Sequence, residues 1–553
     1  MKNFKRFTVS LLALCIAFLL LPSTLSASGV IDTTRDCALT INYADGETSI
    51  SGASFSIYKI AEVDAYGGFT TTPDFSGFNV DIKGKDDEAW RTLASTLEGY
   101  VLRDSITPTD KGVTDSQGIL SFPTGEAKLG TGLYLVLGAR HTQNNTVYEP
   151  SPFIVMLPNT QSGEWVYSQT VDPKFNSTPV PPTPSFNYVD RKVLKVWNDL
   201  EHEHQRPHSV TVQLLRDGIV WDTVTLSDAN NWRYSWSMLD SSYSWTVVEE
   251  FLPDYSVRIY REGITFVVTN TYITDIPDDP PTESDDPEEL EIPPEEPTPD
   301  EPDEPTPDEP ILPQTGQLWW PVPVLSCGGL LFIAIGMLVM SASGKKGIIP
   351  IAIGSLLIFS AIFLSGYNMY DEHRAQTSAN NAVSLLEEFI PEPPDNAAPA
   401  APDSEALPTE IEIPDYKLNP NMSMPKQQVD GVDYIAKLEI PVLNLDLPVI
   451  SDWSYPNLKL APCRYSGTAY LNNLVIAAHN YKSHFGSLKS LNPGDMVILT
   501  DMDGNEFRYE VIETETLQPT AIEDMTSTDY DLTLFTCTLG GSARLTVRCD
   551  KVE

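Results

Sequence analysis

Residues 533–547 read TLFTCTLGGSARLTV, two β-rich runs on either side of Gly540-Gly541. Two glycines between such runs predict a β-hairpin with a two-residue turn. With the glycines in the turn, Cys537 lies opposite Arg544, and paired residues of neighbouring strands have Cβ atoms about 5 Å apart. A thiol next to a permanent cation has a lowered pKa and a larger thiolate fraction. The stretch therefore predicts a cysteine nucleophile with a guanidinium on the same face.

The hairpin ends a strand-rich segment that covers residues 433–553. Short runs such as YIAKLEIPVLNLDLPVI (434–450) alternate with turn residues, which predicts a small β-barrel. The nucleophile needs an acid/base group, and the segment has two histidines. His479 ends the apolar run NLVIAAH, whereas His484 lies in a predicted loop. A lone histidine is more often structural, but the paired cysteine and arginine favour His479 as the partner.

The stretches IAAHNYKSHFGSLKSLNPGD (476–495) and TLFTCT, with Arg544, resemble the sortases, transpeptidases built on an eight-stranded barrel. The resemblance covers residues 433–553. It implies Cys537 as nucleophile, His479 as acid/base and Arg544 as stabiliser of substrate and oxyanion. No cofactor or metal site is predicted, and a need for calcium is left open. The short loop between the cysteine and the arginine differs from that of class C members. The subclass is left open.

A second motif, LPQTG, precedes an apolar run and the pair Lys345-Lys346. The motif, the apolar run and the two lysines, in this order, resemble the cell-wall sorting signal of Gram-positive surface proteins. They also follow a predicted secretory signal and an acidic stalk, both described below. The resemblance implies cleavage between threonine and glycine by a transpeptidase. The predicted motif residues are Leu312, Pro313, Gln314, Thr315 and Gly316.

Two apolar runs, 318–342 and 348–364, are each long enough to cross a hydrocarbon core of about 30 Å. The lysines between them favour the cytoplasmic side. We therefore predict a transmembrane hairpin, with the first helix within 312–347 and the second at 348–367, that leaves both flanking segments outside the cell. Residues 1–28 have a basic start, an apolar run and a small-residue exit, which predicts a signal peptide.

The front half contains two predicted β-sandwiches of immunoglobulin-like type, at 29–176 and 188–272. The second unit, with LKVWNDLEHEHQRPHSVTVQLLRDG, YSWTVVEEFLPDY and ITFVVTNTY, resembles the B-type repeat of collagen adhesins (Cna-B). The resemblance implies an isopeptide crosslink between Lys195 and Asn270, assisted by Glu249. Burial lowers the pKa of an amine and makes it nucleophilic, and Trp197 shares a strand face with Lys195.

The stretch WVYSQTVDPK (165–174) is similar to the pilin motif of Gram-positive shaft subunits. In that family the lysine accepts the next subunit, which implies Lys174 as an acceptor amine. The sequence has Asp172 where the family usually has tyrosine.

The chain has 35 Lys+Arg against 77 Asp+Glu, a formal charge of −42, which argues against nucleic acid as a partner. Residues 275–309 contain no basic residue and many prolines. Such a segment stays extended, so 273–311 are predicted to form a stalk. A juxtamembrane helix and a linker are predicted for 368–432. The few cysteines, among them Cys37, Cys463 and Cys549, do not form a disulfide framework.

Together these features predict a mainly β protein in which a membrane-tethered sortase is fused to its own substrate. Its partners would be LPXTG-bearing surface proteins, including its own front half, and an amine from a pilin lysine or a cell-wall peptide. The front part would pass to the cell wall or a pilus after cleavage. A host-surface ligand is left open. The alternatives are a structural adhesin or pilin with an idle enzyme, and a gene-fusion artefact.

Overall fold

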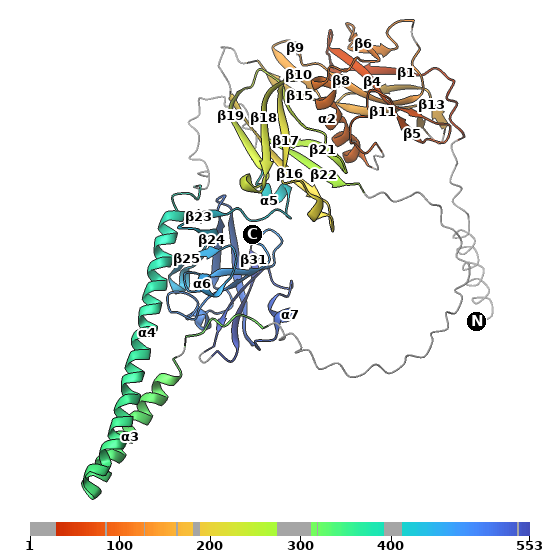
Figure 1. The fold of residues 1–553 in the computed structure, drawn as a ribbon. Helices are drawn as coiled ribbons and strands as arrows, with labels where there is room; N and C mark the ends of the chain where they lie inside the picture. The colour runs from red at the N-terminus through yellow and green to blue at the C-terminus, as the bar shows by residue number, and fades with distance from the viewer. Residues whose placement is uncertain are drawn as a thin grey trace, which may run out of the picture. The chain divides into compact units, whose positions relative to one another are not determined.

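The computed structural model describes residues 29–82, 86–126, 128–161, 164–180, 188–273, 311–317, 319–391, 412–538 and 541–552. The predicted signal peptide and residues 274–310 of the predicted stalk lie outside these ranges. The chain divides into two compact units, one holding Met1–Asp278 and Glu410–Glu412 and the other Asp279–Thr409 and Ile413–Glu553. Each unit is described by itself (Figure 1).

The first sandwich of the front unit has a buried core between its sheets, with side chains from alternate strand positions such as Leu39, Ile41, Phe55 and Ile57. One sheet has the order β14-β1-β7 and another β11-β8-β4-β5, with β6 paired to β4. Further short strands complete it. The strands are β1 (Ala38–Asn42), β2 (Ala44–Asp45), β3 (Thr48–Ser49), β4 (Ser54–Val63), β5 (Phe69–Thr71), β6 (Asp110–Val113), β7 (Ile119–Phe122), β8 (Gly132–Gly138), β9 (His141–Gln143), β10 (Thr146–Pro150), β11 (Phe153–Leu157), β12 (Asn159–Gln161), β13 (Glu164–Val166), β14 (Ser168–Val171) and β15 (Phe175–Pro179).

The structure of this sandwich also contains a helix, α2 (Asp87–Arg103), which was not predicted from the sequence. The Asp86 side chain caps its first turn by accepting from the backbone N–H of Ala89. Its buried residues include Leu93, Leu97 and Val101, which are spaced by four and so fall on one helical face. The same spacing is readable in the sequence.

The second sandwich packs a sheet of order β19-β16-β22-β21 against one of order β18-β17-β20. Strands β16 and β22 run parallel, and their register pairs Lys195 with Val268 and Trp197 with Asn270. The two residues predicted to crosslink therefore lie on adjacent strands. The strands are β16 (Tyr188–Asn198), β17 (Ser209–Arg216), β18 (Ile219–Ser227), β19 (Arg233–Asp240), β20 (Trp245–Glu249), β21 (Tyr255–Glu262) and β22 (Thr265–Tyr272).

The second unit contains a closed barrel of eight strands, as predicted. The order β24-β25-β26-β27-β30-β31-β29-β28 returns to β24 through a further β24–β28 pairing, and β23 adds to β24. The strands are β23 (Gln427–Val429), β24 (Val432–Ile440), β25 (Leu445–Ile450), β26 (Cys463–Ser466), β27 (Leu474–Ala477), β28 (Met496–Asp501), β29 (Glu506–Leu517), β30 (Leu532–Cys537) and β31 (Arg544–Val552). Short helices α5 (Asp415–Leu418), α6 (Tyr455–Leu458) and α7 (Ile522–Met525) lie in the connections.

The predicted hairpin register is confirmed. Cys537 pairs with Arg544, and Thr533 pairs with Arg548. The backbone N–H of Thr538 donates to the Ala543 carbonyl at 3.0 Å, which closes the turn. Of the four turn residues, 539 and 540 lie outside the described ranges.

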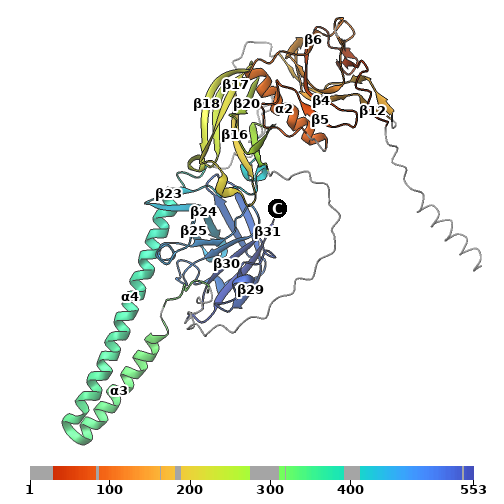
Figure 2. The same ribbon diagram turned by 45° about the vertical axis from the view of Figure 1, so that its right-hand side comes forward.

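Two long helices, α3 (Pro321–Ser343) and α4 (Ile348–Leu386), form an antiparallel pair (Figures 1 and 2). Both are long and apolar enough to cross a membrane. Glycines allow their close approach, since a Cβ on Gly329 would lie 2.8 Å from the Gly354 carbonyl oxygen. Helix α4 continues without a break through the predicted juxtamembrane helix, and its last turns bury Ala379 and Leu386 against the barrel.

Candidate active site

Cys537 and Arg544 stand at one edge of the barrel, where β30 ends and β31 begins. Both side chains are buried, with 3% and 1% exposed. A third residue, His479, lies at the same edge. Strand β27 runs parallel to β30, with Ala477 paired to Phe535. His479 and Cys537 each lie two residues beyond that pair, so the parallel register brings them to the same place.

Neither ring nitrogen of His479 has a hydrogen-bond partner among the described residues, although both are buried. Burial lowers the pKa of this imidazole, and the adjacent backbone of Thr315 opposes that shift. The ring centroid lies 4.8 Å from that of Tyr481. The second histidine, His484, is fully buried, and its burial, together with the proximity of His479, lowers its pKa to about 3. His484 is thus a neutral core residue.

The LPQTG motif of the same chain lies across this edge. The backbone N–H of Thr315 donates to Sγ of Cys537 at 3.0 Å. In return, the backbone N–H of Cys537 donates to Oγ1 of Thr315 at 2.8 Å. A Cβ added to Gly316 would lie 3.1 Å from Cβ of Cys537, closer than ordinary van der Waals contact. The bond between Thr315 and Gly316 is therefore seated directly on the thiol.

Upstream of this bond, two backbone contacts hold Leu312. Its carbonyl oxygen accepts from Nη2 of Arg544 at 2.7 Å, and its N–H donates to the Pro519 carbonyl at 2.8 Å. The Leu312 side chain is fully buried in a cluster with Ala461 and Phe535. The barrel therefore encloses the first residue of the motif.

The carbonyl oxygen of Thr315 accepts from the backbone N–H of Asn480 at 3.0 Å. The Arg544 guanidinium contacts the Leu312 carbonyl of the same motif, and its role as stabiliser of substrate and oxyanion stays a prediction. Sequence reasoning did not identify Asn480. Its position immediately after His479, at the end of a buried strand, is the available signal.

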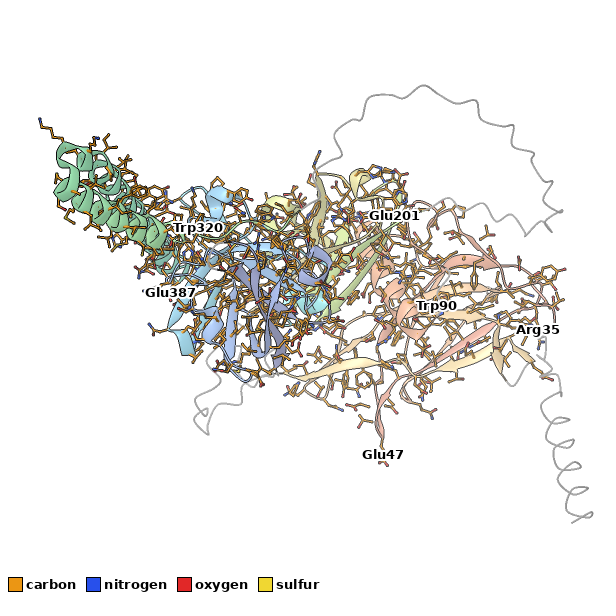
Figure 3. All side chains as sticks on the ribbon, turned by 90° about the horizontal axis from the view of Figure 1, so that it is seen from below. Arg35, Glu47, Trp90, Glu201, Trp320 and Glu387 are labelled. Atoms are coloured by element: carbon orange, nitrogen blue, oxygen red, sulfur yellow. The ribbon has the colours of Figure 1, made fainter. Side chains whose placement is uncertain are left out.

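Helix α4 completes the surroundings of the site. The hydroxyl of Tyr481 donates to Oδ2 of Asp371 at 2.6 Å, and the backbone N–H of Lys482 donates to Oε1 of Glu372 at 3.0 Å. Trp320 lies just before α3 and Glu387 just after α4; both are labelled in Figure 3. Helix α4 continues past the start of α3 and runs along the barrel (Figure 1). The loop that carries the two histidines is thus hydrogen-bonded to α4.

A second cluster lies in the front unit. Nζ of Lys195 lies 3.3 Å from Oε1 of Glu249 and 4.2 Å from the ring centroid of Trp197. Burial lowers the pKa of Lys195 to about 8, while the charge of Glu249 opposes the shift. Asn270 is fully buried, and neither side-chain amide atom has a hydrogen-bond partner among the described residues.

Lys174, the predicted acceptor, is an exposed residue between β14 and β15. Its carbonyl oxygen accepts from the backbone N–H of Ser151 at 2.8 Å. Asp172, which replaces the usual tyrosine, accepts from Nδ2 of Asn42 at 2.7 Å. The residue is therefore exposed, and its backbone is hydrogen-bonded to Ser151.

Comparison with known protein families agrees with both resemblances. Residues 438–552 match the family model of the sortase domain, and residues 191–271 match that of the Cna protein B-type domain. These matches confirm the predicted combination of a B-type domain with a sortase domain. None of the curated proteins matches the chain.

Similar solved structures are sortases. Sortase C1 of GBS pilus island 1 is 24% identical, with a TM-score of 0.19, and the match covers 21% of this chain and 64% of that one. A sortase D5 transpeptidase of Clostridium perfringens is 21% identical (TM-score 0.21; 25% and 94% covered). Sortase C-1 from Actinomyces oris is 25% identical (TM-score 0.20; 21% and 73% covered).

Proposed function

We propose that the chain is a membrane-tethered sortase-type cysteine transpeptidase fused to its own substrate, a pilin-like surface protein. The observation that carries this proposal is the seating of Thr315 on Cys537, with hydrogen bonds in both directions between them. Thr315 thus lies on a cysteine of its own chain that is 222 positions away in the sequence.

The proposed reaction is acyl transfer through a thioester. The Cys537 thiol passes its proton to His479, and Sγ attacks the carbonyl carbon of Thr315. The Asn480 N–H stabilises the developing oxyanion, a role typical of backbone donors. The bond to the Gly316 nitrogen then breaks, and His479 supplies the proton that the departing amine requires. An incoming amine next attacks the thioester, His479 accepts its proton, and Cys537 leaves as the thiolate.

Arg544 acts in this scheme as the residue that fixes the register of the substrate. Its contact with the Leu312 carbonyl lies three residues before the reacting carbonyl. A rigid hold at this distance keeps the scissile bond within reach of the thiol, and such positioning supplies a large part of catalysis in general.

The acceptor amine would be Lys174 of another copy, which gives a fibre, or a cell-wall peptide, which gives anchorage. The exposed amine of Lys174 is consistent with the first. With α3 and α4 in the membrane and Lys345 and Lys346 at the cytoplasmic turn, the barrel and the front half both lie outside the cell. Cleavage then separates the front half from an enzyme that keeps both helices.

The direct test uses the full-length chain in detergent micelles with triglycine as the amine. We expect a front fragment whose last residue, Thr315, carries triglycine, identified by mass spectrometry. An unreacted chain, or a fragment that ends elsewhere, contradicts the proposal and favours a structural surface protein processed by other enzymes.

Cleavage within one chain should follow first-order kinetics. We expect the rate constant for loss of full-length chain to stay unchanged over a hundredfold dilution, because the motif already occupies the site of its own chain. A rate that falls in proportion to concentration would instead indicate that one copy processes another.

We expect Arg544→Ala to slow cleavage about 10- to 100-fold, the range for losing one hydrogen bond from a charged donor. The control is Arg508→Ala, which removes an exposed guanidinium of the same barrel that pairs with Glu506. Melting curves would establish that both variants fold. Equal rates for the two variants would contradict a substrate-holding role for Arg544.

We also propose that Lys195 and Asn270 form an intramolecular isopeptide bond. The neutral Lys195 amine attacks the Asn270 side-chain carbonyl carbon, Glu249 transfers the protons, and ammonia leaves. The supporting observations are the buried lysine–glutamate contact of 3.3 Å and the unpartnered Asn270 amide.

The lowered pKa of Lys195 predicts how this reaction depends on pH. With a folded-state pKa of about 8, the reactive neutral amine increases about tenfold from pH 6 to pH 7 and levels off above pH 8. Chemically synthesised residues 188–273 could be folded at each pH while mass spectrometry follows the loss of ammonia. A rate independent of pH would contradict attack by the neutral amine.

A further inference from the structure

Gln317, the second residue after the scissile bond, is also bound. The backbone N–H of Gln317 donates to Oδ1 of Asn480 at 2.9 Å. Its side-chain Nε2 donates to the backbone carbonyl of Asn368 in α4 at 3.0 Å, and its Oε1 accepts from Nε1 of Trp319 at 2.7 Å. Only 9% of Gln317 is exposed. Both the backbone N–H and the side-chain amide of Gln317 therefore have partners.

Gln314, the second residue before the scissile bond, lacks comparable contacts within the part of the chain that the structure describes. Gln314 is exposed, and no hydrogen bond to its side chain occurs among the described residues. The binding of Gln317 is therefore specific to the leaving side.

Cleavage does not free this leaving segment from the enzyme. From Gly316 the chain passes within a few residues into α3, which packs along α4, and α4 in turn packs against the barrel. An amine held beside its reaction partner reacts as if at very high concentration. The new Gly316 amine would thus stay next to the thioester.

Resting on the function proposed above, we propose that Asn480 and the Asn368 carbonyl form a leaving-side subsite for Gln317, which retains the Gly316 amine and makes acylation reversible until another amine arrives. In the reverse step, the Gly316 nitrogen attacks the thioester carbonyl and restores the peptide bond. The Cys537 thiolate leaves, and the proton of the attacking amine passes to His479.

The test measures how the thioester partitions between its own leaving amine and an added one. The full-length chain in detergent micelles is treated with increasing hydroxylamine, and release of the front fragment as its hydroxamate is followed. The hydroxylamine concentration at half-maximal rate reports the return reaction, whereas the plateau rate reports acylation. Only folded chains contribute to the measured rate of release. Partial misfolding of a variant therefore lowers the plateau rate but does not alter the half-maximal hydroxylamine concentration.

We expect Gln317→Ala to lower the half-maximal hydroxylamine concentration about tenfold, as expected when one or two neutral hydrogen bonds are lost. Gln314→Ala is the matched control and should stay within about twofold of the unsubstituted chain, since its side chain has no bonds to lose. Asn480→Ala, which keeps its backbone N–H, should change the half-maximal concentration in the same direction as Gln317→Ala.

A Gln317→Ala chain with an unchanged half-maximal concentration would overturn the subsite. So would one in which only the plateau falls, because Gln317 would then merely position the substrate. If no chain forms hydroxamate at any concentration, the transpeptidase proposal itself fails, and that outcome is distinct from either of these.

Discussion

Replacing Cys537 by alanine should abolish processing between Thr315 and Gly316. We expect the full-length chain to accumulate and the front fragment to fall by about 10⁴-fold or more, the scale seen when a covalent nucleophile is removed. The remaining hydrogen bonds would still seat the motif, but no group could form the acyl intermediate. The measurement is an immunoblot for the front domains in cells that lack other sortases, together with the purified chain.

Cys327→Ala is the control for this experiment. It removes another free thiol of the chain, one that lies exposed on α3 and away from the barrel edge. Processing should continue at the normal rate. A Cys537→Ala strain that still yields the cleaved fragment would show that another enzyme performs the cut.

The second large effect is expected in the B-type domain. Glu249→Gln should prevent crosslinking, so the mass of the domain should be higher by one ammonia, after allowance for the substitution. An isopeptide bond between Lys195 and Asn270 closes a loop of about 75 residues, which by the loop-entropy model contributes about 4 kcal/mol to the free energy of unfolding. For a domain of this size, its loss lowers Tm by roughly 20 °C.

Glu250→Gln is the matched control, because this neighbouring carboxylate is exposed, whereas Glu249 is 1% exposed. It should leave both mass and Tm unaffected apart from the substitution. An unsubstituted domain that already has the mass of the open chain would disprove the crosslink, whatever the stability of the variants.

Much of this protein could be predicted from short-range patterns. The Cys537–Arg544 pair follows from two glycines between β-rich runs, because a tight turn fixes which residues face each other. Lys195 lies beside Trp197 because alternate residues of a strand share a face. The same kind of reasoning could have found α2 from its apolar spacing.

The end of the second long apolar helix was harder to place. The apolar run stops near residue 364, and the sequence predicts a juxtamembrane helix after it without fixing whether the two are continuous. The structure has one helix from Ile348 to Leu386, with no proline between 351 and 390 to interrupt it. Polarity changes along this stretch, but the backbone has no reason to stop hydrogen bonding.

By itself the sequence determined the parts: a barrel with a cysteine in a β-hairpin, an LPQTG stretch before an apolar helix, and a lysine and an asparagine on the first and last strands of a sandwich. Only the tertiary structure decided that the LPQTG stretch lies on Cys537, that Asn480 rather than Arg544 contacts the Thr315 carbonyl, and that the Asn368 carbonyl binds Gln317. The physical reason is range. Turn and strand patterns fix neighbours a few residues apart, whereas contacts across 163 or 222 residues depend on how α4 and the barrel pack together.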